Sequence, residues 1–116
     1  MIYIFSAFYA EAKNIIDHYG LKKEKNPEMV RFDVFANESI RLVITGVGEI
    51  NAAAAVSNIG GAYGISPDDE ILNVGCGAGF SSDICLGSIF LGNKLTEQMT
   101  GRTFYPDMLM LSLIDI

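Results

Sequence analysis

Two glycine-rich turns constrain the fold of this chain more than any other feature of its sequence. The segments ITGVGEI (residues 44–50) and LNVGCGAGF (residues 72–80) each place glycines directly after an apolar run. Short apolar runs bounded by such turns are typical of buried strands, and the alanine-rich segment after the first turn strongly favours a helix. The sequence therefore predicts two strands that end in glycine turns, with a helix after the first.

The other expected elements alternate between strand and helix. Residues 2–5 form an apolar run typical of a strand buried on both faces, and apolar residues at helical spacing follow from residue 10 to a cap at Gly20. Residues 30–35 and 40–45 are expected to form a hairpin joined at ANES. We expect the alanine-rich helix to end at Gly60 and Gly61, before a buried strand at 71–74 and a further strand within 84–94.

This alternation predicts an α/β fold in which one domain spans residues 1–116 and helices flank a mixed, largely parallel sheet. Ligands of such sheets bind beyond the carboxyl ends of the parallel strands, where both glycine turns are expected. A binding site is therefore expected at that rim. The other explanation of the glycines is that they permit positive φ and close packing between strand and helix.

Charge and composition exclude several classes of protein. The chain has 8 basic and 14 acidic residues, a formal net charge of -6, and no basic cluster beyond residues 22–25, so nucleic acid is not an expected partner. The longest uncharged run, residues 50–67, contains asparagines, serines and glycines, and it predicts no membrane span. The amino-terminal segment lacks the basic region of a secretory signal. We therefore expect a cytoplasmic protein without a membrane partner.

Neither a cofactor nor a metal is expected. Cys76 and Cys85 lack the C-x-x-C spacing and are interpreted as free thiols, with no disulfide framework or zinc site. The first turn has Asn51 where a dinucleotide fingerprint requires its last glycine, and no lysine follows either turn as a phosphate-binding P-loop requires.

Two segments offer side chains for a site. Glu11 begins a predicted helix just beyond the first strand, where it either complements the helix dipole or orients and deprotonates a water molecule. The segment TGRTFYPDM, residues 100–108, sets Phe104 beside an arginine and a tyrosine. It is interpreted either as a lid over a ring-shaped ligand or as a turn with buried aromatic residues.

Three blocks in order resemble the purine nucleoside phosphorylase superfamily, and most closely its 5'-methylthioadenosine/S-adenosylhomocysteine nucleosidase branch. The blocks are YIFSAFYAEAKNII, LVITGVGEINAAAAVS, and ILNVGCGAGF followed by LGSIFLGNKL. They cover most of the first 95 residues, and the second block is the most specific. The resemblance implies the amino-terminal half of a nucleoside phosphorylase-type fold.

The resemblance also implies roles for individual residues. Glu11 matches the catalytic glutamate that holds the attacking water, and Val47 matches the apolar residue that contacts the 5' substituent. The loop beside the ligand and the turn under the ribose and base are matched by Ala7, Phe8, Cys76, Gly77 and Ala78. Cys76 stands where the family often has serine or threonine. Phosphorylases offer a glycine and an arginine to phosphate in the first loop, whereas this chain has Ser6 and no arginine there, which favours hydrolysis.

The chain departs from the family in its later part. Family members are longer, and nothing after Phe104 matches their Met-Glu pair, which binds the ribose hydroxyls, or the aspartate that protonates the purine. We expect a nucleosidase-family protein that hydrolyses the N-glycosidic bond of a methylthioadenosine-like purine nucleoside weakly or not at all as this short chain. The alternatives are a non-catalytic nucleoside-binding or assembly module and a truncated gene product. Half a sheet leaves an unpaired edge, so a homodimer or other self-association is expected.

Overall fold

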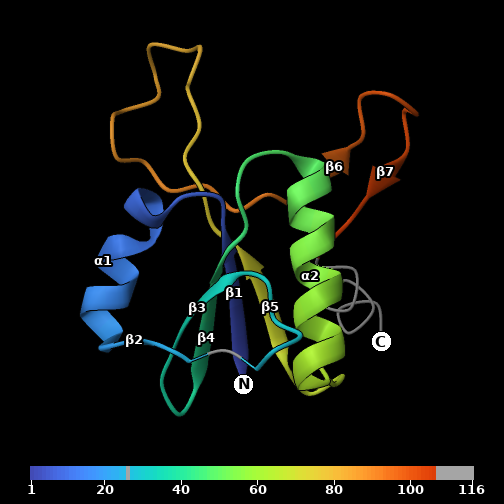
Figure 1. Ribbon diagram of the computed structural model, residues 1–116. Helices are drawn as coiled ribbons and strands as arrows, with labels where there is room; N and C mark the ends of the chain where they lie inside the picture. Colours follow the sequence, from blue (N-terminus) through green and yellow to red (C-terminus); the bar gives the residue numbers. More distant parts are fainter. Residues whose placement is uncertain (26, 107–116) are drawn as a thin grey trace, which may run out of the picture. The chain divides into compact units, whose positions relative to one another are not determined.

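The computed structural model describes residues 1–25 and 27–106 (Figure 1). The sequence predicts one domain over 1–116, and the contacts divide the chain into two units, Met1–Ala78 and Gly79–Ile116. The first unit holds both helices and a five-stranded sheet. The second unit holds a two-stranded sheet.

The sheet of the first unit is mixed. Its order is β2-β3-β4-β1-β5, and its strands are β1 (Ile2–Ser6), β2 (Lys22–Lys23), β3 (Asp33–Ala36), β4 (Ile40–Ile44) and β5 (Glu70–Asn73). β1 pairs in parallel with β4 and with β5, whereas β2 with β3 and β3 with β4 are antiparallel. The prediction of α/β structure and of the β3–β4 hairpin is confirmed. The prediction that the sheet is largely parallel is wrong, because the hairpin and β2 add as many antiparallel pairings as there are parallel ones.

Two helices flank this sheet, α1 (Tyr9–Tyr19) and α2 (Glu49–Tyr63) (Figure 1). α1 ends at Gly20 in the left-handed region (φ 63°), as predicted. The predicted end of α2 is wrong, because Gly60 and Gly61 lie inside the helix and it continues to Gly64 (φ 68°). The Gly64 N–H donates to the Gly60 carbonyl at 2.9 Å, and this left-handed residue ends the helix.

The core lies on both faces of the sheet. Side chains of β1 alternate, so that Ile4 packs with Ala12 and Ile16 of α1, whereas Phe5 packs with Ile59 of α2. All five of these apolar side chains are buried. The prediction that the first strand is buried on both faces is therefore confirmed.

The sequence predicts β5 as a buried strand, but its apolar side chains are about half exposed. Ile71 is 51% exposed and Leu72 is 45% exposed. Among the described strands only β1 pairs with β5, which places it at the edge of the sheet. A position at the edge explains the exposure, because an apolar strand is buried only where neighbours cover it.

A polar cluster holds the amino-terminal end of β4 against α2. The Arg41 guanidinium donates to the Tyr3 hydroxyl at 2.9 Å and lies 4.1 Å from the centre of the Tyr63 ring. The Tyr63 hydroxyl donates to the Glu24 carboxylate at 2.9 Å. Burial, and then this contact with Glu24, raises the pKa of Tyr63 above its usual value. At the amino-terminal end of β4, these polar side chains therefore bind one another.

The second unit contains little regular structure. Its hairpin consists of β6 (Leu95–Thr96) and β7 (Thr103–Phe104), paired in antiparallel fashion. The prediction of a strand within 84–94 is wrong, because no strand forms in this segment and Gly87 has a φ of 87°, outside the extended region. Several large apolar side chains of the segment are fully or nearly fully exposed, among them Leu86, Ile89 and Leu91.

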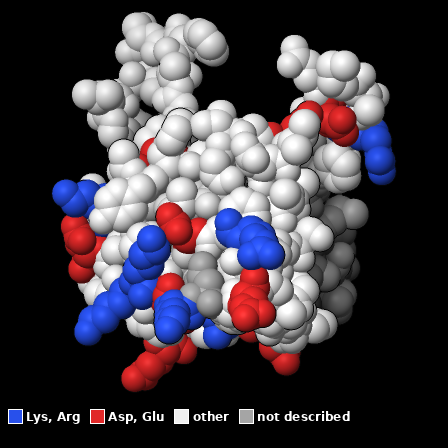
Figure 2. Space-filling view, in the orientation of Figure 1, with Lys and Arg blue, Asp and Glu red and all other residues white. Residues whose placement is uncertain are grey.

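Basic and acidic side chains are interspersed on the face shown in Figure 2. Lys23 and Asp33 form an ion pair at 3.4 Å.

Within residues 1–25 and 27–106, neither helix has the length and apolar character that crossing a membrane requires.

Candidate functional site

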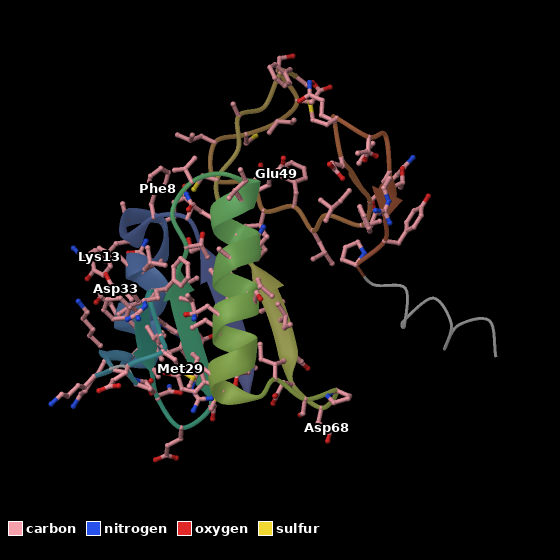
Figure 3. All side chains as sticks on the ribbon, turned by 45° about the vertical axis from the view of Figure 1, so that its right-hand side comes forward. Phe8, Lys13, Met29, Asp33, Glu49 and Asp68 are labelled. Carbon is pink, nitrogen blue, oxygen red and sulfur yellow. The ribbon has the colours of Figure 1, made fainter. Side chains whose placement is uncertain are left out.

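The topology of the first unit creates a crevice at the carboxyl end of its parallel strands. β1 and β4 are neighbours, but the loop after β1 leads to α1 and the loop after β4 leads to α2 on the opposite face. Adjacent strands whose connections diverge in this way leave a binding crevice between their loops. Phe8 and Glu49 lie at this end of the unit, whereas Asp68 lies at the other end (Figure 3).

The first glycine turn is set by backbone hydrogen bonds to β1. The Thr45 N–H donates to the Ser6 carbonyl at 2.8 Å, and the Gly46 N–H donates to the Ala7 carbonyl at 3.1 Å. Gly46 then has a φ of 85°, and Gly48 has φ 93° and ψ 161°, a region that only glycine readily adopts. Backbone conformation therefore requires these glycines.

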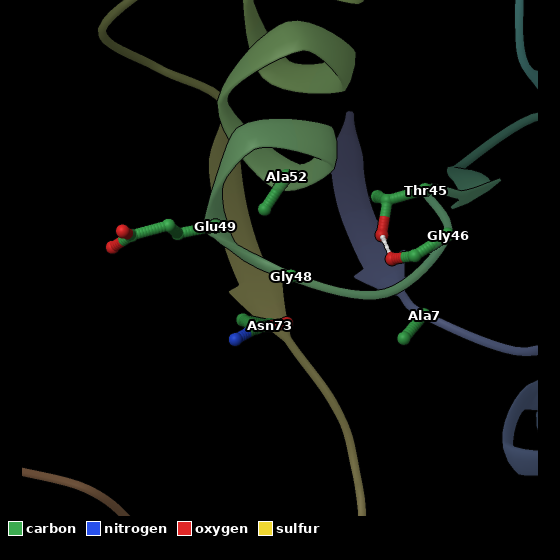
Figure 4. Close-up of a pocket in the computed structure, with 7 residues that line it drawn as sticks. All are labelled: Ala7, Thr45, Gly46, Gly48, Glu49, Ala52 and Asn73. Atoms are coloured by element: carbon green, nitrogen blue, oxygen red, sulfur yellow. Dashed lines mark hydrogen bonds between the residues drawn. The ribbon is translucent and has the colours of Figure 1, made fainter.

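A hollow of about 350 Å³ opens at this turn (Figure 4). Its lining residues come from the ends of three parallel strands and from the start of α2; they are Ala7, Thr45, Gly46, Gly48, Glu49, Ala52 and Asn73. Small-ligand pockets span roughly 300–1,000 Å³, so the hollow suits a small ligand or one part of a larger one.

The uncharged polar side chains of the hollow are those of Thr45 and Asn73. The Thr45 hydroxyl donates to the Gly46 carbonyl at 2.8 Å, which leaves its lone pairs as acceptors (Figure 4). The Asn73 side chain forms no hydrogen bond with the described residues. It therefore offers both a donor and an acceptor to a ligand.

Glu11 reaches the same rim from α1. It lies in the first turn of this helix and is partly buried. Its Oε2 is 3.3 Å from the position that a Cβ on Gly75 would occupy, so the carboxylate lies against the start of the second glycine turn. No other described residue forms a hydrogen bond or ion pair with this carboxylate. It does not line the hollow but is available to hold a water molecule beside it.

Of the other residues predicted for the site, Ala7 lines the hollow, whereas Phe8, Val47, Cys76, Gly77 and Ala78 do not. Phe8 precedes α1 and is half exposed, and Val47 lies between two lining glycines with 60% of its surface exposed. Cys76, Gly77 and Ala78 are exposed. A Cβ on Gly77 would meet no atom within 4 Å, so no protein contact explains this glycine.

Phe104 belongs to the second unit. It lies in β7 and is about half exposed, with the Arg102 guanidinium 5.4 Å from the centre of its ring. Both cysteines of the chain are free thiols, as predicted, and the structure places them at the surface.

Sequence reasoning missed Thr45, Glu49 and Asn73. Thr45 directly follows β4, Asn73 is the last residue of β5, and Glu49 is the first residue of α2. The available signal was their position, because polar residues at the carboxyl ends of parallel strands meet at one rim.

Comparisons with family models, with curated proteins and with solved structures found no match to this chain. Within residues 1–25 and 27–106, no group of three His, Cys, Asp or Glu side chains is placed to hold a metal ion. The arrangement itself offers a small polar hollow and, near Gly75 at the same rim, a carboxylate without a partner among the described residues, which suits the activation of water next to a bound organic ligand.

Proposed function

We propose that this chain is a nucleosidase-type protein that hydrolyses the N-glycosidic bond of a purine nucleoside resembling methylthioadenosine. The observation that carries the proposal is the Glu11 carboxylate, which has no partner among the described residues and lies against Gly75, two residues after Asn73 of the hollow. The order of strands, turns and helices supports the amino-terminal half of a nucleoside phosphorylase-type fold. The sequence resemblance supports the substrate class.

In this reaction the bond between the sugar C1' and the purine nitrogen breaks with oxocarbenium character. Glu11 orients a water molecule and accepts its proton while the water oxygen bonds to C1'. The departing purine takes up a proton on nitrogen. No aspartate of this sequence matches the family's general acid, and loss of a general acid costs about 10²- to 10⁴-fold in rate. We therefore expect slow turnover.

Release of adenine from methylthioadenosine tests the proposal. Glu11→Gln removes the base but keeps the shape, and it is expected to lower the rate by about 10²-fold or more. Glu38→Gln is the matched control, because Glu38 is an exposed carboxylate in the β3–β4 hairpin at the other end of β4. Equal turnover by Glu11→Gln and the wild type would remove Glu11 from the mechanism.

A non-catalytic nucleoside-binding module is the second candidate, favoured by the free donor and acceptor of Asn73 in the hollow. Calorimetry with adenosine distinguishes the two functions. Binding without any release of adenine would support the module and contradict the nucleosidase.

The exposed edge of β5 supports an assembly role through a second copy of this chain. Antiparallel pairing of two β5 strands about a twofold axis would set Ile71 opposite Leu72 and Glu70 opposite Asn73, so that like charges do not meet. Sedimentation of the wild type and of Ile71→Lys tests this pairing. A monomeric wild type at about 100 μM would contradict it, since micromolar affinity corresponds to about 8 kcal/mol.

A cytoplasmic location is part of the same proposal. It is supported by the two exposed free thiols, which a reducing compartment preserves.

A further inference from the structure

Among the residues that the structure describes, Glu49 is the only charged one that lines the hollow. The other six lining residues have no ionisable side chain, and neither lysine nor arginine is among them. Glu49 is exposed at the first turn of α2, and Figure 4 shows its side chain extending away from Thr45 and Gly46. Its carboxylate therefore flanks the hollow without filling it.

Two electrostatic contributions of opposite sign meet at this place. The amino-terminal end of α2 borders the hollow, and a helix end of this kind carries roughly +0.5 of an elementary charge, which attracts anions. The Glu49 carboxylate in the same turn carries a full negative charge and outweighs it. Glu11 at the same rim adds a second negative charge on the α1 side. The local field thus opposes an anionic ligand.

We propose that Glu49 determines specificity by excluding anions, so that the hollow accepts uncharged or cationic nucleosides and rejects phosphate and 5'-phosphorylated nucleosides. The identity of the ligand as a nucleoside rests on the proposed function. The exclusion of anions rests on the charges of Glu49, Glu11 and the amino-terminal end of α2, and not on the identity of the ligand. Because phosphate is excluded from the hollow, water is left as the attacking group.

Equilibrium binding of adenosine, adenosine 5'-monophosphate and inorganic phosphate tests the proposal. The wild type is expected to bind adenosine at least about tenfold more tightly than the monophosphate, since a like charge near a half-exposed site acts at this scale. In Glu49→Gln this ratio is expected to fall by about threefold to tenfold through tighter binding of the monophosphate. The difference is expected to shrink at about 1 M salt, where screening acts within a few ångströms.

Two variants serve as controls. Glu49→Asp keeps the charge and is expected to keep the ratio within about twofold, and Glu38→Gln removes a charge at the other end of β4 with no change in the ratio. Both substituted positions are exposed, and thermal unfolding establishes that each variant folds.

The outcomes separate this proposal from the nucleosidase itself. An unchanged ratio in Glu49→Gln would overturn the role of Glu49, and so would a failure of all three probes to bind either protein. If phosphate binding rises in Glu49→Gln but methylthioadenosine yields no adenine, the exclusion of anions stands and the nucleosidase function falls.

Discussion

Replacing Gly75 by alanine tests whether the second glycine turn exists to admit the Glu11 carboxylate. An added Cβ would lie 3.3 Å from Glu11 Oε2, closer than an ordinary van der Waals contact, so the carboxylate must move by a few tenths of an ångström. Gly75 does not have a positive φ, so alanine introduces no backbone strain. The substitution therefore displaces the carboxylate while leaving the fold in place.

The expected magnitudes differ for stability and for activity. Alanine in place of glycine restricts the unfolded chain and stabilises the fold by about 0.4–1 kcal/mol where the backbone permits it. A displacement of about 1 Å in a catalytic group costs about 10²-fold in rate, so a few tenths of an ångström should cost about threefold to tenfold. Gly75→Ala should thus be as stable as the wild type or more so, and slower.

Gly77→Ala is the matched control in the same turn. Gly77 also lacks a positive φ, and its added Cβ would meet no atom within 4 Å. It should show the same gain in stability, and any loss of adenine release from methylthioadenosine should appear in KM and not in kcat, because Gly77 matches the turn under the ribose and its added Cβ does not meet Glu11. Urea unfolding and the adenine-release assay on both variants give the comparison. If the two variants lower kcat equally, the contact between Glu11 and Gly75 has no catalytic role, and the reasoning is refuted.

Four further predictions concern single positions of the first unit. Gly48→Ala should cost about 1–3 kcal/mol in urea unfolding, because its φ of 93° and ψ of 161° strain any side chain; a neutral result would contradict this. Ser6→Ala should raise stability by about 1 kcal/mol, because the buried Ser6 hydroxyl has no hydrogen-bond partner among the described residues, and a loss would reveal a partner. Asn58→Ala should cost about 1–2 kcal/mol, since the Asn58 side chain donates to one backbone carbonyl at 2.7 Å and accepts from one backbone N–H at 3.0 Å in the segment before β3; an unchanged midpoint would refute this. A backbone N–H and the Met1 ammonium at 3.2 Å lower the pKa of Asp69. The wild type should therefore be more stable than Asp69→Asn above about pH 4, and this difference should vanish as the pH falls through the lowered pKa. Thermal melts from pH 7 to pH 2 measure the difference, and its persistence at pH 2 would contradict the prediction.

Local features of the sequence predicted most elements of the first unit. The apolar run at the start predicted β1. Apolar residues at helical spacing, followed by Gly20, predicted α1 and its end, and the segment ANES predicted the β3–β4 hairpin. These features act through φ preferences and side-chain periodicity within a few residues, and such signals are readable without knowledge of the fold. Glu11 was found for the same reason, as a lone carboxylate at a strand-to-helix junction.

The failures concern features that depend on distant partners. Residues 71–74 are apolar enough for a buried strand, yet β5 is exposed because only β1 pairs with it among the described strands. The apolar segment within 84–94 formed no strand, since apolar character predicts a strand only where a neighbour pairs with it. Gly60 and Gly61 have helical φ values, and tertiary packing of α2 overrides their weak helix preference.

The sequence by itself therefore determined β1, α1 with its end at Gly20, the β3–β4 hairpin and which carboxylate stands at the first junction, because these properties arise from neighbouring residues. Tertiary structure alone decided that Thr45, Glu49 and Asn73 share one hollow and that the Glu11 carboxylate lies against Gly75. Residue 11, residues 45–49 and residues 73–75 are far apart in the chain, and only the parallel pairing of β1 with β4 and β5 brings these three segments to one rim.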